Sequence, residues 1–290
     1  MSKIIKIDGG LGRVITATGS IPDECIVATS FPDIFIGNPK VKRVYNLGHA
    51  FLFEDVVYDN EWVEVEPYNT HDYYNKKNHL SQVFNKMWNG VDEATKPQIF
   101  LQDFEIENAG NFVKQFDKFV VFQPFGSNMK QDITRRAMPL HIAQMSVDYL
   151  NKKGYKVLYI KGQDHPDLKN VIAITQPIRG VFSIIANADK IITCDSFVQH
   201  AAAALDKKAL VFWCGTDERN VGYDTNTNIR IGESLVHANR IPMNNPELIT
   251  KNKYDWKFKE VQSHINKYLG MSEDSKPTKE VDKDEQTTKD

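Results

Sequence analysis

Short apolar runs alternate with helical patterns over the second half of the chain. Apolar runs bounded by turn residues predict buried strands, whereas apolar residues at intervals of three and four predict helices. The expected strands are residues 119–122, 155–160, 171–174, 190–193 and 209–213, and the expected helices are residues 139–153, 180–188 and 197–205. Strands that alternate with helices are typical of a parallel, doubly wound sheet, whose ligands bind beyond the carboxyl ends of the strands. The second half is therefore expected to be an α/β unit of Rossmann type.

The first half is also expected to be α/β, with a less regular pattern. Residues 3–8 predict a short strand, and a turn with glycines at Gly9, Gly10 and Gly12 leads into an expected helix over residues 13–20. Further short apolar runs follow at residues 25–28, 44–45 and 55–58, with loops between them. Between residues 79 and 88, apolar side chains recur at helical spacing, which is more typical of a core face than of a ligand site.

The length of the chain favours two domains, because 290 residues is about twice the usual domain size. The polar stretch 103–117 has weak periodicity, and we expect the boundary there, between a domain of residues 1–115 and one of residues 116–250. Residues 251–270 carry a helical stripe of apolar side chains. The highly charged residues 271–290 are expected to be disordered.

Composition and charge are those of an ordinary globular protein, with 41% hydrophobic and 26% charged residues. A formal charge of −2 gives no general reason to expect DNA or an anionic membrane as a partner, and it argues weakly against nucleic acid. The start of the chain has no apolar signal core and no run of about 18 apolar residues occurs, so a cytoplasmic location is expected. Cys25, Cys194 and Cys214 lack the spacing of metal ligands and are interpreted as buried thiols.

A polar pair, Asp195 and Ser196, stands between an expected strand and an expected helix. Ser196 and Gln199 have the S-x-x-Q pattern of a capping box, which alone would explain a polar residue at the start of an apolar helix. A second interpretation is a phosphate site, because the turn directs unpaired N–H groups and the positive end of the helix dipole at one point. His200 lies one turn later on the same face, where it is either packed or functional.

Other polar loops are expected at the same edge of the sheet. They are residues 123–128, which include Ser127 and Asn128; residues 161–164, which begin with Lys161; and residues 214–217, which include Gly215 and Thr216. Arg135 and Arg136 follow the first of these loops. An adjacent arginine pair is either a solvated surface feature or, at the rim of a phosphate site, a forked ligand for a diphosphate.

The glycine turn near the start does not satisfy the pattern of a dinucleotide-binding fold. Ile15 occupies the position of the third glycine, and no acidic residue ends the next strand. We therefore expect no nicotinamide or flavin cofactor. We expect the glycines instead to let a substrate approach the backbone closely.

Four stretches of the chain carry motifs that, taken together, are similar to those of a known protein family. They are IIKIDGGLGRVITATGSI, VVFQPFGSNMKQDITRRAMP, VLYIKGQDHP and TCDSFVQHAAAALDKKALVFWCGTDE. Together they resemble glycosyltransferase family 9, which includes the lipopolysaccharide heptosyltransferases and has the GT-B architecture of two Rossmann-type domains facing a cleft. The family's D-S-G-P-x-H helix start and later G-P-T-D loop are similar to the last stretch in order and spacing. The resemblance covers most of residues 1–220 and is strongest over residues 119–220.

The resemblance implies a function for each half of the chain. Residues 1–115 would bind the acceptor, residues 116–250 would bind a nucleotide-diphosphate-sugar donor, and the helix in 251–270 would pack back across the cleft. The donor-binding residues that it implies are Ser127, Asn128, Arg136, Lys161, Asp195, Ser196, Phe197, Val198, Gln199, His200, Gly215 and Thr216. No cofactor is implied beyond the nucleotide-sugar, which is a substrate.

Two positions depart from the family pattern. Arg13 occupies the place of the family's catalytic aspartate, and a guanidinium cannot accept the acceptor's proton. Phe197 replaces a glycine where backbone and phosphate meet. Asp8 is the nearest substitute carboxylate, and it is equally compatible with a simple turn residue.

The leading hypothesis is an inverting, metal-independent glycosyltransferase. Metal-dependent glycosyltransferases commonly use an Asp-x-Asp motif, and the one such motif here, Asp282-Lys283-Asp284, lies in the expected disordered tail. The alternatives are a GT-B nucleotide-sugar-binding or structural protein without transfer activity, and a GT-B sugar-nucleotide epimerase or hydrolase. The acceptor stays open, with a saccharide favoured by family analogy; His71, Tyr68, Tyr73 and Tyr74 are candidate contacts for it.

Overall fold

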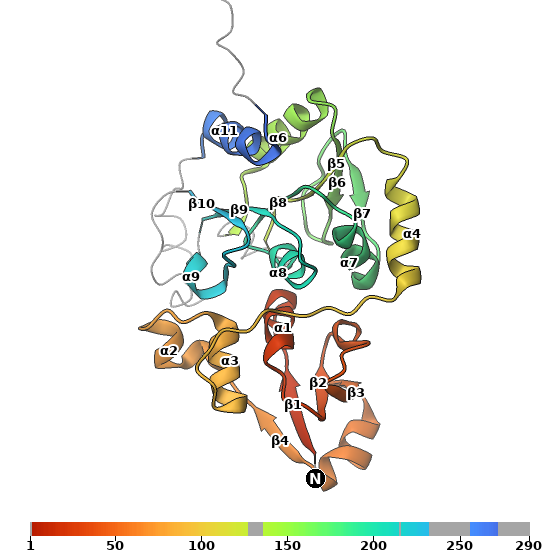
Figure 1. The fold of residues 1–290 in the computed structure, drawn as a ribbon, viewed down its shortest axis with the longest axis vertical. Coiled ribbons are helices and arrows are strands. Elements are labelled where there is room, and N and C mark those ends of the chain that lie inside the picture. The colour runs from red at the N-terminus through yellow and green to blue at the C-terminus, as the bar shows by residue number, and fades with distance from the viewer. Residues whose placement is uncertain (1, 127–135, 215, 232–255, 272–290) are drawn as a thin grey trace, which may run out of the picture.

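The protein consists of two α/β halves, each built on one parallel sheet (Figure 1). The computed structural model describes residues 2–126, 136–214, 216–231 and 256–271. The sheet of the first half has the strand order β3-β2-β1-β4, and that of the second half has the order β10-β9-β8-β5-β6-β7. All of the strand pairs are parallel. The expected α/β class with two parallel sheets is therefore confirmed.

In the first half, the central strand is the one that the opening residues predict. The strands are β1 (Lys3–Ile7), β2 (Cys25–Thr29), β3 (Val41–Asn46) and β4 (Glu61–Glu64), and the helices include α1 (Leu11–Ala17), α2 (His71–Tyr74) and α3 (Leu80–Asn89). The apolar run at residues 55–58 belongs to two helical turns, Leu52–Val56 and Val57–Asp59. Leu52 and Val56 are one turn apart, and both are buried against Ile4 and Ile26 of the sheet. Burial of both side chains on one face explains why this run is helical, and strand β4 begins only after it.

The second half follows the expected alternation closely. Its strands are β5 (Phe119–Gln123), β6 (Lys156–Ile160), β7 (Ile172–Ile174), β8 (Ile191–Cys194), β9 (Leu210–Trp213) and β10 (Thr227–Arg230). Its helices are α6 (Leu140–Lys152), α7 (Ile178–Ala186), α8 (Phe197–Ala204), α9 (Glu218–Val221) and α11 (Phe258–Leu269). The edge strand β10 was not expected, because it reads Thr-Asn-Ile-Arg and no residue in it is fully buried.

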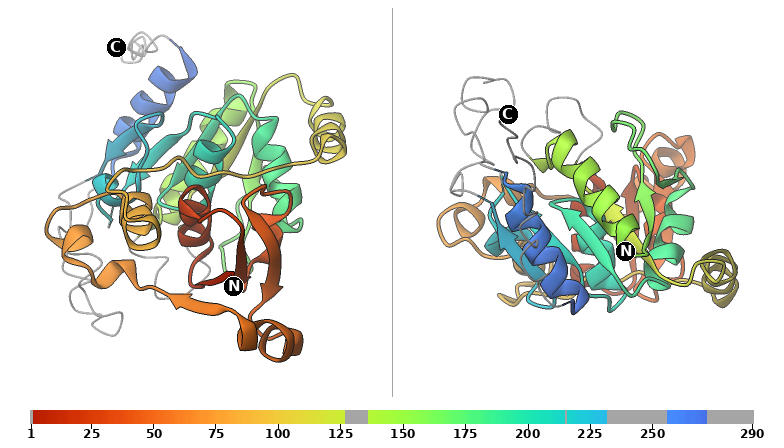
Figure 2. Two further views of the ribbon diagram at one scale, coloured as in Figure 1. Left: turned by 60° about the horizontal axis from the view of Figure 1, so that its bottom comes forward. Right: turned by 90° about the horizontal axis from the view of Figure 1, so that it is seen from above.

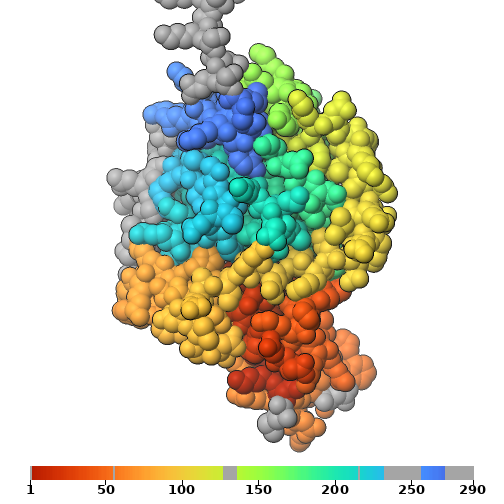
Figure 3. Space-filling view, viewed as in Figure 1, coloured from red at the N-terminus to blue at the C-terminus, as the bar shows by residue number. Residues whose placement is uncertain are grey.

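The segment 103–117, at which the sequence predicts the domain boundary, contains helix α4 (Asp103–Val113). This helix packs against α7 of the second half, and the Arg179 guanidinium forms an ion pair with Glu105. The chain crosses between the halves earlier, in the extended stretch between α3 and α4, which Figure 3 shows running along their junction and up the side of the second half. A single buried residue, Val113, explains the weak helical pattern of α4.

Helix α11 lies beside α6, as the view from above in Figure 2 shows. Val261, Ile265 and Leu269 form its buried face within the core of the second half. Figure 1 places α11 at the end of the molecule opposite the first half. This position differs from the packing across the cleft that the family resemblance implies.

Candidate functional site

The two halves meet where α1 and α8 begin. A Cβ atom added to Gly12 would lie 2.8 Å from Cδ2 of His200 and 3.6 Å from Cα of Phe197. Position 12 therefore requires glycine, because real Cβ atoms do not approach other atoms so closely. A Cβ added to Gly10 would have no neighbour within 4 Å, and Gly9 has a φ of +107°, which favours glycine. The expected close approach at this turn is thus made, at Gly12, by the second half of the protein itself.

Ser196 caps α8, as its place in the sequence predicts. Its Oγ accepts a hydrogen bond from the backbone N–H of Val198 at 3.2 Å and lies 2.8 Å from Oγ1 of Thr193. The reciprocal half of the expected capping box does not form. The Gln199 Oε1 atom, which would accept that bond, instead accepts one from Asn226 Nδ2 at 3.4 Å, and the Gln199 amide donates to the carbonyl of Val221 at 2.8 Å. Gln199 therefore holds the chain after α9 against α8.

Three loops converge around Asp195, at the carboxyl ends of β5, β8 and β9. The buried Asp195 carboxylate accepts a hydrogen bond from Thr216 Oγ1 at 2.5 Å, and Arg136 Nη1 lies 3.7 Å away. A Cβ added to Gly126 would lie 2.5 Å from the Asp195 carbonyl oxygen, so the loop after β5 presses directly on this turn. The structure thus brings together four of the expected donor-site residues, namely Arg136, Asp195, Ser196 and Thr216.

Other expected site residues fall elsewhere. Ser127, Asn128 and Gly215 lie outside the described residues. Lys161 follows β6 at the same edge of the sheet, but its ammonium group lies 2.5 Å from Oδ1 of Asp167 in its own loop. Phe197 is partly buried, and its side chain packs against the hydrophobic core. Because the Phe197 side chain packs into the core, it does not cover the backbone N–H groups at the start of α8.

His200 is buried at the junction of the halves. Its Nδ1 lies 2.9 Å from the hydroxyl of Thr16 and 2.9 Å from that of Tyr223. Burial lowers the pKa of His200 to about 3, so the imidazole is neutral at physiological pH. Of the two interpretations of this residue, the structure supports a packed histidine that joins α1 to α8.

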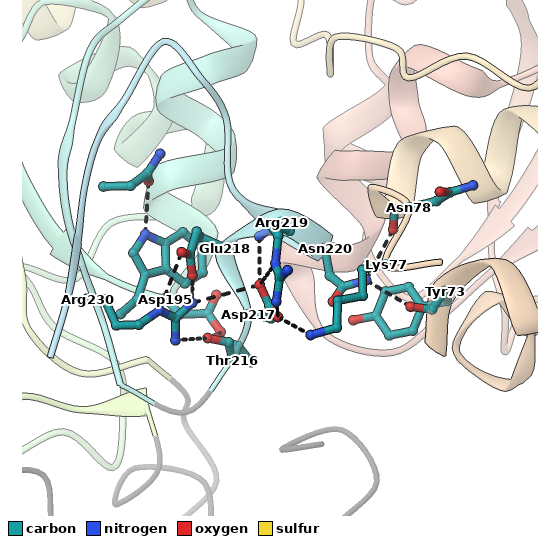
Figure 4. A network of polar contacts seen from close by, with 12 residues as sticks. Tyr73, Lys77, Asn78, Asp195, Thr216, Asp217, Glu218, Arg219, Asn220 and Arg230 are labelled. Carbon is teal, nitrogen blue, oxygen red and sulfur yellow. Dashed lines mark hydrogen bonds and ion pairs between the residues drawn. The ribbon is translucent and has the colours of Figure 1, made fainter. Parts of the chain in front are cut away.

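A polar network continues the junction beyond α8 (Figure 4). Asp217 caps α9 and accepts hydrogen bonds from Lys77 of the first half at 3.0 Å and from Arg219 at 2.6 Å. Burial would raise the pKa of Asp217, but the hydrogen bonds from Arg219 and Lys77 outweigh it and hold the pKa below its usual value. Asn220 donates to the carbonyls of Tyr73 and Asn78 at 3.0 and 3.2 Å. The sequence carries no signal for the contacts of this network between the halves, because those partners are about 140 residues apart.

Arg13, at the family's aspartate position, is paired with a carboxylate that the sequence analysis did not identify. Its Nη1 lies 2.9 Å from Oε2 of Glu66, and its Nη2 donates to the carbonyl of Val65 at 3.2 Å. The guanidinium carbon lies 5.1 Å from the centre of the Tyr68 ring, at the distance of a cation–π contact. Asp8 has no hydrogen bond or ion pair with any residue that the structure describes.

Tyr68 and Tyr73 lie where charged groups of the two halves meet. Burial raises the pKa of Tyr68 to about 12; the positive charges of Arg13 and Arg136 oppose this rise, and the negative charges of Asp195 and Glu66 add to it. The Tyr73 ring stands edge-on to that of Tyr68, with 5.1 Å between their centres. Of the aromatic candidates, these two are therefore nearest to the turn at Asp195, whereas His71 is exposed.

The cysteines are free and buried, as expected. Burial raises the pKa values of Cys25 and Cys214 to about 12. The described residues contain no group of three or more His, Cys, Asp or Glu side chains placed to hold a metal ion. Within the same ranges, no helix combines the length and the apolar character needed to cross a membrane.

The sequence matches no protein-family model and no curated protein. Solved structures of similar fold nevertheless exist, among them the following three. The glycosyl transferase family 9 protein from Veillonella parvula DSM 2008 is 11% identical with a TM-score of 0.65, and the match covers 92% of this chain and 97% of that chain. The iron-containing dodecameric glycosyltransferase TibC from enterotoxigenic E. coli H10407 is 13% identical with a TM-score of 0.64, covering 93% of this chain and 76% of that chain.

The third structure is the E. coli ADP-heptose lps heptosyltransferase II, which is 12% identical with a TM-score of 0.62 over 93% of this chain and 98% of that chain. These identities are low, so what the three matches establish is the fold. The chain has the GT-B arrangement of two facing α/β units, in agreement with the resemblance of its motifs to family 9.

Proposed function

We propose that the protein is a glycosyltransferase that moves a sugar from a nucleotide-diphosphate-sugar to an acceptor hydroxyl. The observation that carries this proposal is the turn at the start of α8. There, Ser196, Arg136 and Thr216 converge at the carboxyl edge of one sheet and face the other half of a GT-B fold. Ligands of doubly wound folds bind at this edge.

The start of α8 suits the donor's diphosphate. The first N–H groups of a helix have no acceptor within the helix, and the helix dipole adds positive potential there. The Arg136 side chain, which is 30% exposed, adds a forked guanidinium that can bind two phosphate oxygens at once. The Phe197 side chain packs into the core, so the replacement of the family's glycine is compatible with a phosphate at this turn.

The reaction that we propose is a single inverting displacement without a metal ion. The acceptor oxygen forms a bond to the anomeric carbon while the bond from that carbon to the diphosphate breaks, and the electron pair leaves with the nucleoside diphosphate. Arg136 and the α8 dipole stabilise the charge that develops on the leaving group. The second half, residues 116–250, would bind the donor, and the first half, residues 1–115, would bind the acceptor, for which a saccharide is the leading class.

The test is a panel of nucleotide-sugars, including an ADP-sugar because a protein of similar fold is described as an ADP-heptose transferase. A donor at 100 times its Kd stabilises the folded state by about 2.7 kcal/mol, which thermal unfolding detects. We expect one donor class to raise Tm and to release nucleoside diphosphate when cell extract supplies an acceptor. A panel in which no donor raises Tm would refute the diphosphate site at α8.

A second candidate, a nucleotide-sugar-binding protein without transfer activity, is favoured by one observation. Arg13 cannot accept a proton, and its guanidinium is engaged with Glu66. This candidate requires that a donor raise Tm while no acceptor elicits release of nucleoside diphosphate. The same panel therefore separates the two functions.

A further inference from the structure

Three carboxylates follow the strands of the first half at the edge that faces the second half. Asp8 comes after β1, Glu64 ends β4, and Glu66 comes after β4. Glu64 forms an ion pair with Lys6 at 2.6 Å. Glu66 forms one with Arg13 at 2.9 Å. Asp8 has no polar partner in the part of the chain that the structure describes, so nothing there orients its carboxylate.

The Glu66 carboxylate is held at both oxygens and remains accessible. Oε2 accepts a hydrogen bond from Arg13 Nη1 at 2.9 Å, and Oε1 accepts one from the backbone N–H of Tyr68 at 3.1 Å. A carboxylate has about four acceptor positions, so each oxygen keeps a lone pair. The Glu66 side chain is 47% exposed, so these lone pairs are open to another molecule. Orientation and access are two of the properties that a general base needs.

Glu66 also lies on the wall of the first half that meets the donor turn. Gly12, next to Arg13 in the chain, is in contact with Phe197 and His200 at the start of α8. The Tyr68 hydroxyl, two residues after Glu66, interacts electrostatically with Glu66 and Arg13 from its own half and with Asp195 and Arg136 from the other.

We propose that Glu66, oriented by Arg13, is the catalytic base of the transfer reaction, an inference that rests on the proposed glycosyltransferase function. The acceptor's hydroxyl proton passes to a free lone pair of the Glu66 carboxylate as its oxygen bonds to the anomeric carbon. The bond to the diphosphate breaks with its electron pair, and the protonated Glu66 returns the proton to solvent. Arg13 is a positioning residue, because a guanidinium has no lone pair to offer a proton.

The ion pair between Arg13 and Glu66 makes position 13 a positioning residue, whereas the family pattern implies the catalytic base at that position. The carboxylate comes from the loop after β4 and the cation from α1, instead of a carboxylate from α1 itself. Because β1 and β4 are neighbouring parallel strands, the loops after them meet at one edge, and the base can be supplied from either strand.

The experiment compares Glu66→Gln, Asp8→Asn and, as the matched control, Glu64→Gln, which neutralises the ion-paired glutamate at the end of β4. The measurements are nucleoside diphosphate release over pH 4–9 and donor Kd by equilibrium dialysis. Loss of a general base should lower kcat of Glu66→Gln by about 10²–10⁴-fold with donor Kd unchanged, and should remove the fall in rate on the acid side of the wild-type profile. Glu64→Gln should keep the wild-type rate and profile.

Three further variants test the roles of Glu66 and Arg13 and guard against misfolding. Glu66→Asp keeps a carboxylate about one bond shorter and should fall between Glu66→Gln and wild type in kcat. Arg13→Gln should lower kcat and leave the acid limb of the pH profile in place, because the base is still present but poorly oriented. Arg13→Lys should recover part of the rate.

The outcomes separate this inference from the function on which it rests. A wild-type rate for Glu66→Gln, or the loss of the acid limb in Asp8→Asn with its retention in Glu66→Gln, would overturn the role of Glu66 and leave the transferase intact. Wild-type protein that binds a donor but releases no diphosphate, to acceptor or to water, would overturn both. No donor binding at all would refute the proposed function itself.

Discussion

Replacing Gly12 with alanine should destabilise the junction between the halves, because the new methyl group would lie 2.8 Å from Cδ2 and 3.0 Å from Nε2 of His200. The imidazole cannot move away easily. It is buried, and Thr16, Tyr223 and Gln199 all lie within hydrogen-bond distance of its nitrogens. Overpacking a rigid site costs about 1–3 kcal/mol.

Alanine gives back part of that cost, because it favours a helix over glycine by less than about 1 kcal/mol. The net loss for Gly12→Ala should be about 1–2 kcal/mol, which corresponds to a fall in Tm of about 2–6 °C. The assay is thermal unfolding followed by circular dichroism, with tryptophan fluorescence as a second probe.

The matched control is Gly10→Ala in the same turn. Gly10 has a φ of −71° and a ψ of 147°, which alanine adopts freely, and a Cβ there meets nothing within 4 Å. Its Tm should stay within about 1–2 °C of wild type, since the expected change is a few tenths of a kcal/mol. Equal stability for Gly12→Ala and Gly10→Ala would refute the close contact between α1 and α8.

Three more results follow from buried groups. Asp217→Asn should lower the free energy of unfolding at pH 7 by about 1–3 kcal/mol, with the exposure of Arg219 keeping the loss at that level. Because the folded pKa of Asp217 is depressed, its contribution is fully present above about pH 4 and is lost progressively as the pH falls from there toward the folded pKa, so urea unfolding at pH 7 and pH 3 should show the difference between the two proteins narrowing in acid. The folded state keeps His200 neutral down to about pH 3, so below about pH 6.5 the unfolded chain takes up the proton first and the free energy of unfolding falls. His200→Gln should remove about 2 kcal/mol of the fall in the free energy of unfolding that wild type shows between pH 7 and pH 5. An unchanged fall would contradict burial of a neutral imidazole. The three thiols should react with a thiol reagent in denaturant and resist it in the native protein, since burial raises their pKa values; a fast native reaction would contradict this.

The sequence predicted the parts of the fold in which local pattern and burial agree. Strands β5, β6, β8 and β9 are continuous apolar runs because both faces of a parallel sheet are covered, so they are visible without tertiary information. The edge strand β10 and helix α4 bury too little apolar surface to leave such a pattern. What holds α4 in place is its contact with α7, including an ion pair between residues 74 positions apart.

In the candidate site, too, contacts between neighbouring residues were predictable from the sequence and contacts between distant residues were not. Ser196 was predicted as a cap because a helix start depends on neighbouring residues, and the structure has that cap. The capping-box bond expected of Gln199 was wrong, because its Oε1 accepts from Asn226, 27 residues later, and its amide donates to the carbonyl of Val221, 22 residues later. The pair of Arg13 and Glu66 joins residues 53 positions apart through the pairing of β1 with β4, and no local pattern encodes it.

The central claim is that the start of α8 binds a diphosphate with the help of Arg136. Equilibrium dialysis of ADP and UDP measures this directly, with Lys42→Ala, which alters an exposed ion pair on β3, as the control for loss of a surface charge. Wild type and Lys42→Ala should bind one nucleotide per chain with equal Kd, and Arg136→Ala should weaken binding by about tenfold or more, the loss of a charged hydrogen bond of about 1.5–3 kcal/mol. Binding that is absent in wild type, or undiminished in Arg136→Ala, would contradict the claim.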